Sequence, residues 1–150
     1  SGSRVTAANI NQEVIKKLKK EIMINEVNPV KLFSTPCDVV SPCALGGVIN
    51  KSNKEALKCK AIVGAANNQL DDADTGIWLL KNNIIYSPDY LVNSGGVIAI
   101  AAEINKTEDL IEKELEKISD RLTIVLEESK KNDESTNSVA KRIAWDRINK

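Results

Sequence analysis

Amide side chains follow two short apolar runs in this chain, where they could bind a planar polar ligand. Asn67 and Asn68 come after the run at residues 61–63, and Asn93 comes after the run at residues 84–86. In a doubly wound α/β protein, a dinucleotide and its substrate bind at the carboxyl ends of parallel strands. An Asn side chain offers two N–H donors and one carbonyl acceptor, which complement a nicotinamide carboxamide. The pattern therefore predicts a dinucleotide-binding edge.

Each of these amides also has a purely local interpretation. Asn67 follows the small residues 64–66, which would let a flat ring approach, but by spacing alone Asn67 and Asn68 could equally cap the next turn. Asn93 stands before a Gly-Gly pair whose helix start would aim free N–H groups at an amino-acid carboxylate. The alternative for Asn93 is an N-cap that serves its own helix.

The elements that would position these side chains alternate in type along the chain. Apolar runs of three or four residues are typical of buried parallel strands. Apolar residues at about 3.6-residue spacing predict amphipathic helices, the longest of which Thr107 could cap. The expected strands are residues 5–8, 37–40, 61–63 and 84–86. The expected helices are residues 11–22, 53–58, 75–81, 95–103, 108–131 and 138–149.

Composition excludes several classes of function. Lys and Arg together number 21, as do Asp and Glu, so no net field attracts nucleic acid or an acidic membrane. Aromatic residues make up only 3% of the chain, which argues against base-stacking surfaces. The apolar stretches are shorter than the roughly 20 residues that cross a bilayer, and no secretory signal opens the chain. We expect a cytoplasmic protein with no nucleic-acid or membrane partner.

Residue types that support other chemistries are absent or badly spaced. The chain has no His, so it holds no Ser-His-Asp triad, no Cys-His pair and no H-E-x-x-H zinc site. Cys37, Cys43 and Cys59 lack C-x-x-C spacing and are interpreted as buried thiols, although Cys43 could also belong to a ligand-side turn. The acidic run at residues 71–74 lacks the spacing of a Ca²⁺ loop and is interpreted as a helix start. We expect no metal site.

Three motifs carry a family resemblance. They are SPCALGG at residues 41–47, GAANNQL at residues 64–70 and YSPDYLVNSGG at residues 86–96, in the family's order and near its spacing. With them the chain resembles the glutamate/leucine/phenylalanine/valine group of amino-acid dehydrogenases, and most closely the leucine dehydrogenases. The resemblance implies NAD(P)-dependent, reversible oxidative deamination of an apolar L-amino acid to a 2-oxo acid and ammonia.

The resemblance also implies which residues contact the ligands. Asn67 would bind the nicotinamide, and Ala44 and Leu45 would act near the ribose through main-chain groups. Asn93 would contact the amino acid, and two positions of the long helix would line its aliphatic side chain, although the residues alone indicate only a packing helix. The cofactor-side residues are Asn9, Cys43, Ala44, Leu45, Ala66 and Asn67. The substrate-side residues are Asn93, Leu122 and Val125.

Asn9 departs from the family pattern at the end of the second strand of the cofactor domain. Family members typically carry an Asp there that bonds the adenosine ribose and repels the extra phosphate of NADP. An amide still bonds a hydroxyl but has no repulsive charge. NAD is the cofactor that the resemblance implies, and NADP is an open alternative because Asn9 carries no charge. Asn9 could also be an ordinary turn residue.

Family members open with a substrate domain that carries two active-site lysines and an aspartate, followed by a first strand and a Gly-x-Gly-x-x-Gly turn. The seven glycines of this chain lack that spacing. We expect an α/β fold with an incomplete Rossmann-like doubly wound parallel sheet, lacking the first strand and Gly-rich turn, and with long C-terminal helices. The missing strand would lie between residues 5–8 and 61–63, and no catalytic residue is expected in this chain.

Two parts are expected, and two alternative functions are weighed. Residues 1–105 would form a partial NAD(P)-binding domain, and residues 106–150 would form helices that pack on it and toward the substrate domain. The parent enzyme is expected to be a homo-oligomer that binds an amino acid and a dinucleotide. The first alternative is a non-catalytic nucleotide-binding or assembly module derived from such an enzyme. A redox sensor at Cys37 or Cys43 is disfavoured because both adjoin apolar runs that suggest burial.

Overall fold

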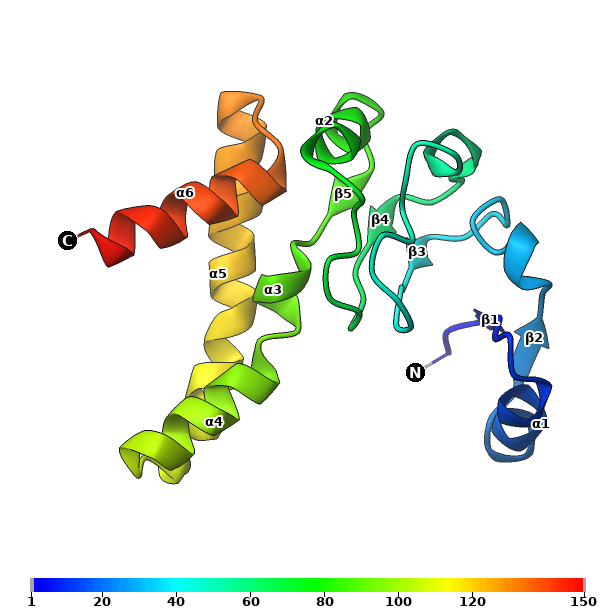
Figure 1. Ribbon diagram of the computed structural model, residues 1–150, viewed down its shortest axis with the longest axis horizontal. Helices are drawn as coiled ribbons and strands as arrows, with labels where there is room; N and C mark the ends of the chain where they lie inside the picture. The colour runs from blue at the N-terminus through cyan, green and yellow to red at the C-terminus, as the bar shows by residue number, and fades with distance from the viewer. Residues whose placement is uncertain (1, 150) are drawn as a thin grey trace.

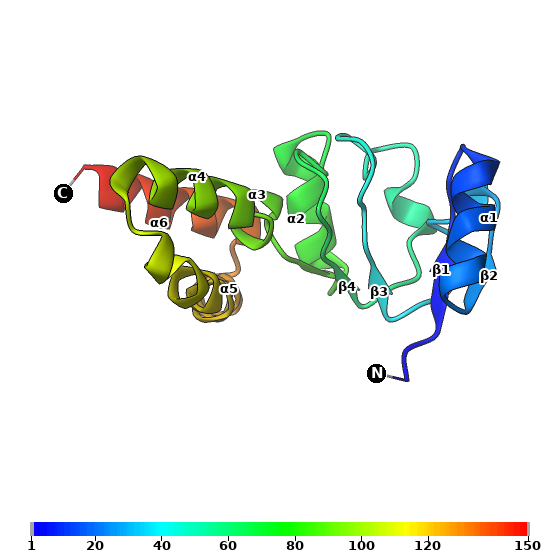
Figure 2. The same ribbon diagram turned by 90° about the horizontal axis from the view of Figure 1, so that it is seen from below.

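The chain folds as an α/β structure with a two-stranded sheet and a helix at one end, a three-stranded sheet in the middle and helices at the other end. The computed structural model describes residues 2–149, with α1 at one end of the long axis and the C-terminal helices at the other (Figure 1, Figure 2). The strands are β1 (Val5–Ala7), β2 (Ile24–Glu26), β3 (Val39–Val40), β4 (Ala61–Ile62) and β5 (Ile85–Tyr86). The α-helices are α1 (Gln12–Glu21), α2 (Ala73–Lys81), α3 (Asp89–Val92), α4 (Gly95–Asn105), α5 (Ile111–Asn132) and α6 (Thr136–Ile148). The 3-10 helices are η1 (Pro29–Lys31), η2 (Lys54–Ala56) and η3 (Glu108–Leu110).

These five strands are all parallel, and they form two small sheets. One sheet contains β3, β4 and β5 in that order, and the other contains β1 and β2. The α/β class, the parallel strands and the long C-terminal helices are therefore confirmed. The sequence prediction lacks β2, because Asn25 and Glu26 are polar and the apolar run before them, at residues 22–24, overlaps the end of the predicted helix at residues 11–22.

The predicted position of the gap in the sheet is wrong. The sequence places a missing strand beside residues 61–63, whereas β4 pairs on both sides. On the side that faces away from β5, the edge strand of the larger sheet is β3, whose Val39 is half exposed. Within residues 2–149, no strand pairing joins β1 and β2 to the other three strands. The error follows from the overlooked β2, since it shifts every later strand by one place in the doubly wound order.

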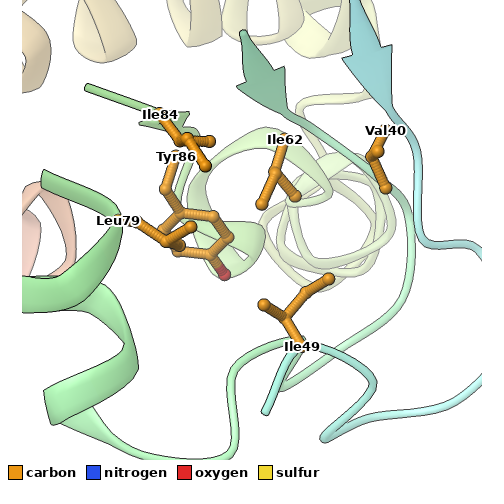
Figure 3. Close-up of a cluster of buried hydrophobic side chains, with 6 residues drawn as sticks. All are labelled: Val40, Ile49, Ile62, Leu79, Ile84 and Tyr86. Atoms are coloured by element: carbon orange, nitrogen blue, oxygen red, sulfur yellow. The ribbon is translucent and has the colours of Figure 1, made fainter. Parts of the chain in front are cut away.

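The main core lies where α2 covers the larger sheet. Ile62, Leu79 and Ile49 are fully buried there, and the Tyr86 ring lies between Leu79 and Ile62 (Figure 3). Each fully buried aliphatic side chain contributes about 1.5–3 kcal/mol of transfer free energy. This cluster fixes the spacing between β4 and β5, and with it the spacing of the turns that follow these strands.

The acidic run before α2 starts that helix. The Asp72 side chain accepts the backbone N–H of Thr75 over 2.8 Å, and Asp71 Oδ1 accepts the Thr75 hydroxyl over 2.6 Å. Lys51 Nζ lies 2.8 Å from Asp72 Oδ2 and lowers the pKa of that carboxyl, chiefly through this hydrogen bond. The interpretation of residues 71–74 as a helix start is therefore confirmed.

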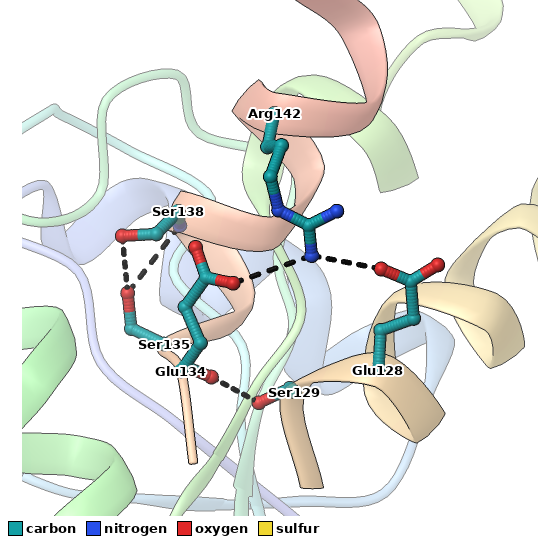
Figure 4. A network of polar contacts seen from close by, with 6 residues as sticks. All are labelled: Glu128, Ser129, Glu134, Ser135, Ser138 and Arg142. Carbon is teal, nitrogen blue, oxygen red and sulfur yellow. Dashed lines mark hydrogen bonds and ion pairs between the residues drawn. The ribbon is translucent and has the colours of Figure 1, made fainter. Parts of the chain in front are cut away.

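Polar contacts join α5 to α6 at the C-terminal end. Arg142 Nη2 donates to Glu128 over 2.8 Å and to Glu134 over 3.3 Å (Figure 4). Ser129 Oγ donates to the Glu134 carbonyl over 2.6 Å, and Ser135 is the N-cap of α6. These contacts fix the turn between the two helices. No helix within residues 2–149 combines the length and apolar character that a bilayer crossing requires.

Two predicted helical features are wrong. The Thr107 side chain caps no helix, because η3 comes between it and the start of α5. Residues 53–58 contain only the single turn η2 instead of a crossover helix. Asn53 explains the second difference, since its side chain accepts the Asn50 N–H over 3.0 Å and donates to the Val48 carbonyl over 2.7 Å. An Asn that bonds nearby backbone in this way competes with helix formation.

Candidate functional site

Asn67 and Asn93 meet between the turns that follow β4 and β5. Asn93 Nδ2 donates to Asn67 Oδ1 over 2.7 Å and lies 3.3 Å from the Ala65 carbonyl oxygen. Because a carbonyl can only accept, the Ala65 oxygen sets the orientation of the Asn93 amide, and Asn93 in turn sets that of Asn67. Asn67 Nδ2 and Asn93 Oδ1 have no hydrogen-bond partner within residues 2–149. The pair therefore presents the Asn67 NH₂ group as a donor and Asn93 Oδ1 as an acceptor to a ligand.

Neither local interpretation of these two amides fits the structure. Asn93 follows the last residue of α3, and the N-cap position of α4 is Ser94, which makes no capping bond with its side chain. Asn67 is exposed and uses its carbonyl oxygen for Asn93 instead of for a backbone N–H. Asn68 is the turn residue of the pair, with a left-handed backbone at φ 52°.

Asp89 fixes the Asn68 turn through a side-chain hydrogen bond, and this residue is not predicted from the sequence. The Asp89 side chain is buried, and its Oδ2 accepts the Asn68 backbone N–H over 2.6 Å. Its Oδ1 accepts the Tyr86 hydroxyl over 2.9 Å. Burial, and then the hydrogen bond to Asp89, raise the pKa of Tyr86. Asp89 lies inside the motif at residues 86–96, but nothing local indicates a partner 21 positions away.

Glycine and alanine residues after β4 serve contact between turns. A Cβ on Gly64 would lie 2.2 Å from the Pro42 carbonyl oxygen, so only glycine fits. Ala66 is buried, and its N–H donates to the same Pro42 oxygen over 2.9 Å. The sequence predicts that these small residues admit a ring, whereas the structure gives Gly64 a packing role. A cofactor contact by Ala66 stays a prediction.

Gln69 is a second residue that the sequence analysis misses. Its side chain is 0% exposed, and Nε2 donates to the carbonyls of Gly64 over 2.7 Å and Ala66 over 2.9 Å. Two main-chain oxygens of the turn are thereby satisfied from inside, which leaves the Asn67 side chain outside. The signal in the sequence is a third amide directly after Asn67 and Asn68, in a segment that is otherwise apolar.

The turn at residues 41–47 packs against the Asn67 turn. The Gly47 N–H donates to the Asn68 carbonyl over 2.7 Å, and a Cβ on Gly46 would lie 2.9 Å from the Asn67 carbonyl oxygen. Ala44 and Leu45 are exposed beside it, and Leu45 keeps 72% of its surface accessible. An exposed apolar side chain at a strand end suits contact with a ligand.

The cysteines are less buried than the sequence predicts. Cys37 and Cys43 are exposed and Cys59 is half-buried, so the interpretation as buried thiols is wrong for the first two. Cys43 Sγ lies 3.4 Å from Ser41 Oγ. Partial burial, with a smaller contribution from Asp38, raises the pKa of the Cys37 thiol and lowers its thiolate fraction. Low thiolate content, not burial, is therefore the argument against a redox role for Cys37.

Asn9 lies apart from the other candidates, in the smaller sheet. It follows β1, and its Oδ1 accepts the Asn11 backbone N–H over 2.8 Å. Asn11 in turn is the N-cap of α1. The structure thus gives Asn9 the role of a turn residue, and no contact within residues 2–149 joins it to Asn67 or Asn93. A ribose contact by Asn9 stays a prediction.

Leu122 and Val125 lie on α5, behind α3. Val125 is buried against Val139, and Leu91 of α3 packs on the same cluster. Leu122 is half-buried. Val125 also lines a cavity of about 140 Å³ between α3, α5 and α6. Val125 can therefore affect Asn93 through α3, while direct contact of Leu122 or Val125 with a substrate stays a prediction.

Parallel strands followed by turns with exposed amides are the arrangement in which α/β proteins bind ligands at the carboxyl ends of their strands. Comparison with known proteins gives the family. Residues 3–150 match the sequence model of Glutamate/Leucine/Phenylalanine/Valine dehydrogenase, and the chain belongs to this family.

Relatives with different named substrates are similar to this chain. Leucine dehydrogenase of Thermoactinomyces intermedius is 36% identical over 98% of this chain, and L-tryptophan dehydrogenase of Nostoc punctiforme is 40% identical over 82%. The crystal structure of the Nostoc punctiforme L-tryptophan dehydrogenase superposes with a TM-score of 0.92 at 34% identity, over 97% of this chain and 44% of that one. The chain spans 40% of the length of that leucine dehydrogenase and 35% of that of the tryptophan enzyme.

Proposed function

We propose that this chain is the C-terminal cofactor-binding part of an NAD(P)-dependent amino-acid dehydrogenase that resembles leucine dehydrogenase. The reaction is the reversible oxidative deamination of an apolar L-amino acid to a 2-oxo acid and ammonia. The observation that carries the proposal is the hydrogen-bonded pair of amides, Asn67 and Asn93, at the carboxyl ends of β4 and β5. The NH₂ group of Asn67 and the side-chain oxygen of Asn93 are left free for a ligand. The bound dinucleotide would supply the hydride acceptor.

The exposed groups around this pair fit a dinucleotide. Asn67 Nδ2 would donate to the nicotinamide carboxamide, and the main chain at Cys43, Ala44 and Leu45 would lie along the ribose, with Ala66 behind it. The support is that the turn at residues 41–47 is exposed and is bonded to the Asn68 carbonyl, so both turns face one edge. Asn9 would contact the adenosine ribose, where its neutral amide admits either NAD or NADP.

Asn93 Oδ1 would accept a hydrogen bond from the amino acid. The sequence pattern directs the N–H groups of the helix start after Asn93 at a carboxylate. The side-chain N–H groups of Asn93 face Asn67 and Ala65, and its free atom, Oδ1, is an acceptor. The ammonium group of the substrate is the complement of that oxygen. Leu122 and Val125 would set the shape of the pocket for the apolar side chain.

We infer that residues 1–105 form the cofactor-binding part and that residues 106–150 form helices that support it from the side of α3. Packing of α5 against α3 and α4 favours this division, because α5 lies behind the segment that carries Asn93. Named relatives act on leucine, phenylalanine or tryptophan, which favours an apolar amino acid without selecting one. The parent enzyme is expected to be a homo-oligomer.

Turnover by the complete enzyme that carries this chain tests the proposal. We expect reduction of NAD or NADP by L-leucine, L-phenylalanine or L-tryptophan, and much less by L-glutamate. The 150-residue chain alone is expected to give none, because acid-base groups typically supply a factor of ~10²–10⁴ and the lysines expected for that work lie outside it. Dinucleotide binding by the complete enzyme without turnover on any amino acid would instead favour the non-catalytic module.

A further inference from the structure

We propose that Asp89 is a positioning residue that holds both ligand-facing amides in place. The inference rests on the proposed function, since it concerns the site that Asn67 and Asn93 form. Asp89 begins α3 and keeps only 6% of its surface exposed. Its carboxyl oxygens accept two hydrogen bonds, one from the Asn68 backbone N–H at 2.6 Å and one from the Tyr86 hydroxyl at 2.9 Å.

Asp89 is bonded to each half of the amide pair. Through its side chain it fixes the backbone of Asn68, the residue next to Asn67. Through its own carbonyl it accepts the Asn93 backbone N–H over 2.9 Å. Asp89 is therefore hydrogen-bonded both to the turn after β4 and to the turn after β5. This arrangement brings the Asn67 and Asn93 side chains to their 2.7 Å hydrogen bond.

A carboxyl group suits this place because both of its neighbours are donors. Asn68 has a left-handed backbone that is held at both ends, by the Asp89 carboxyl at its N–H and by the Gly47 N–H at its carbonyl. A buried N–H without an acceptor is costly, so removing the carboxyl would free the turn to move toward water. Asn67 would then lose its hydrogen bond from Asn93, although neither side chain had been altered.

The test uses three variants in the complete enzyme that carries this chain. Asp89→Leu keeps similar bulk and leaves both donors without an acceptor. Asp89→Asn is the conservative rescue, because its carbonyl can accept the Asn68 N–H while its amide donates to the Tyr86 oxygen. Tyr86→Phe is the matched control, since it removes one donor of the cluster and leaves the Asn68 bond in place.

We expect Asp89→Leu to lower kcat/KM at least ~10-fold, with Asp89→Asn and Tyr86→Phe within a few-fold of wild type. The decisive measurement is a double-mutant cycle with Asn67→Ala. If Asp89 acts through Asn67, then Asn67→Ala adds little loss in the Asp89→Leu background. A residue that merely stabilises the fold would lower the melting temperature while the two kinetic losses multiplied. Multiplicative losses would overturn the proposal.

A second readout needs no turnover. In the Asp89→Leu chain, the side-chain NH₂ resonances of Asn93 should move toward the values of a free amide, whereas in Tyr86→Phe they should stay. Unchanged Asn93 resonances in Asp89→Leu would refute the positioning role. If Asp89→Leu does not fold, Asp89→Ser replaces it in both measurements. An inactive wild-type enzyme would instead count against the proposed function, so the two failures are distinguishable.

Discussion

Asn93 donates from Nδ2 to Oδ1 of Asn67 over 2.7 Å, across 26 positions of sequence. The bond joins the turns that follow β4 and β5. It leaves the NH₂ group of Asn67 and the side-chain oxygen of Asn93 free to face a ligand. The site is thus a pair, and its two members should be tested together.

In the complete enzyme, Asn67→Ala and Asn93→Ala should each lower kcat/KM. The loss of transition-state stabilisation should be about 1–3 kcal/mol each, because each change removes a hydrogen bond to a polar ligand. We expect Asn67→Ala to weaken dinucleotide binding and Asn93→Ala to raise chiefly the KM of the amino acid. The double variant should lose less than the sum, since each change also frees the other amide. Steady-state kinetics with both substrates varied measure this, and wild-type kinetics in both single variants would remove these residues from the site.

Asn9→Asp should move cofactor preference toward NAD. An aspartate would repel the 2′-phosphate of NADP and still accept from the ribose hydroxyls. The measurement is the ratio of kcat/KM for NAD and NADP in the complete enzyme, with Asn11→Asp as a control two residues further along. An unchanged ratio would leave Asn9 with only its turn bond to Asn11.

Gly64→Ala should destabilise the chain by about 1–3 kcal/mol or more, because the new Cβ would lie 2.2 Å from the Pro42 carbonyl oxygen. Gly96→Ala is the matched control, since a Cβ there meets nothing within 4 Å and lies in α4. The control should be neutral or stabilising by up to ~1 kcal/mol. Urea unfolding of both variants decides, and equal stabilities would mean that the Pro42 contact is relaxed in solution.

Stability should fall in alkali because of Tyr86. Burial and the bond to Asp89 raise the pKa of Tyr86 in the folded state. A raised pKa contributes stability that is fully present below the unfolded value, near pH ~10, and is lost as pH rises toward the folded value. Tyr90, whose pKa burial raises to about 12, adds to the same loss. Unfolding free energies should therefore stay level up to pH ~10 and decline above it. Tyr86→Phe should flatten that decline, and an equally steep decline in this variant would exclude Tyr86 as its cause.

The smaller sheet should be the least protected part of the chain. Val5 and Thr6 of β1 are exposed, and Ile15 of α1 is the only fully buried apolar side chain described before β3. Few buried contacts mean easy local opening. Amide hydrogen exchange of a monomeric sample should show faster exchange in β1 and β2 than in β4. Strong protection of residues 5–7 would contradict this expectation.

The spacing of apolar residues along the chain predicts the helices and strands whose side chains follow a regular pattern. Periodic apolar residues marked α1 and α5, and short apolar runs marked β4 and β5. The strand β2 escaped because its Asn25 and Glu26 are polar and its pairing with β1 is tertiary. Thr107 has the residue type of a cap, but the chain inserts η3 before α5.

The candidate site was predicted only where residue type alone was informative. Amides after strands indicated Asn67 and Asn93, and the structure brings these two together. Asp89 and Gln69 were missed because their partners are set by how turns from different strands pack. The predicted roles of Asn9, Leu122 and Val125 come from family resemblance. The structure gives Asn9 a local hydrogen bond and Val125 a packing contact, and it leaves Leu122 half-buried.

Close contact between the turns limits which segments of this chain could be exchanged with those of a relative. Gly46 faces the Asn67 carbonyl oxygen at 2.9 Å from where a Cβ would be, and Gly47 adopts φ 66° while its N–H bonds the Asn68 carbonyl. A donor segment for residues 41–47 with a side chain at either glycine would collide with the recipient's amide turn or strain its own backbone. Transplanting cofactor preference from a relative would therefore require residues 41–47, 64–69 and 86–93 to move as one cassette.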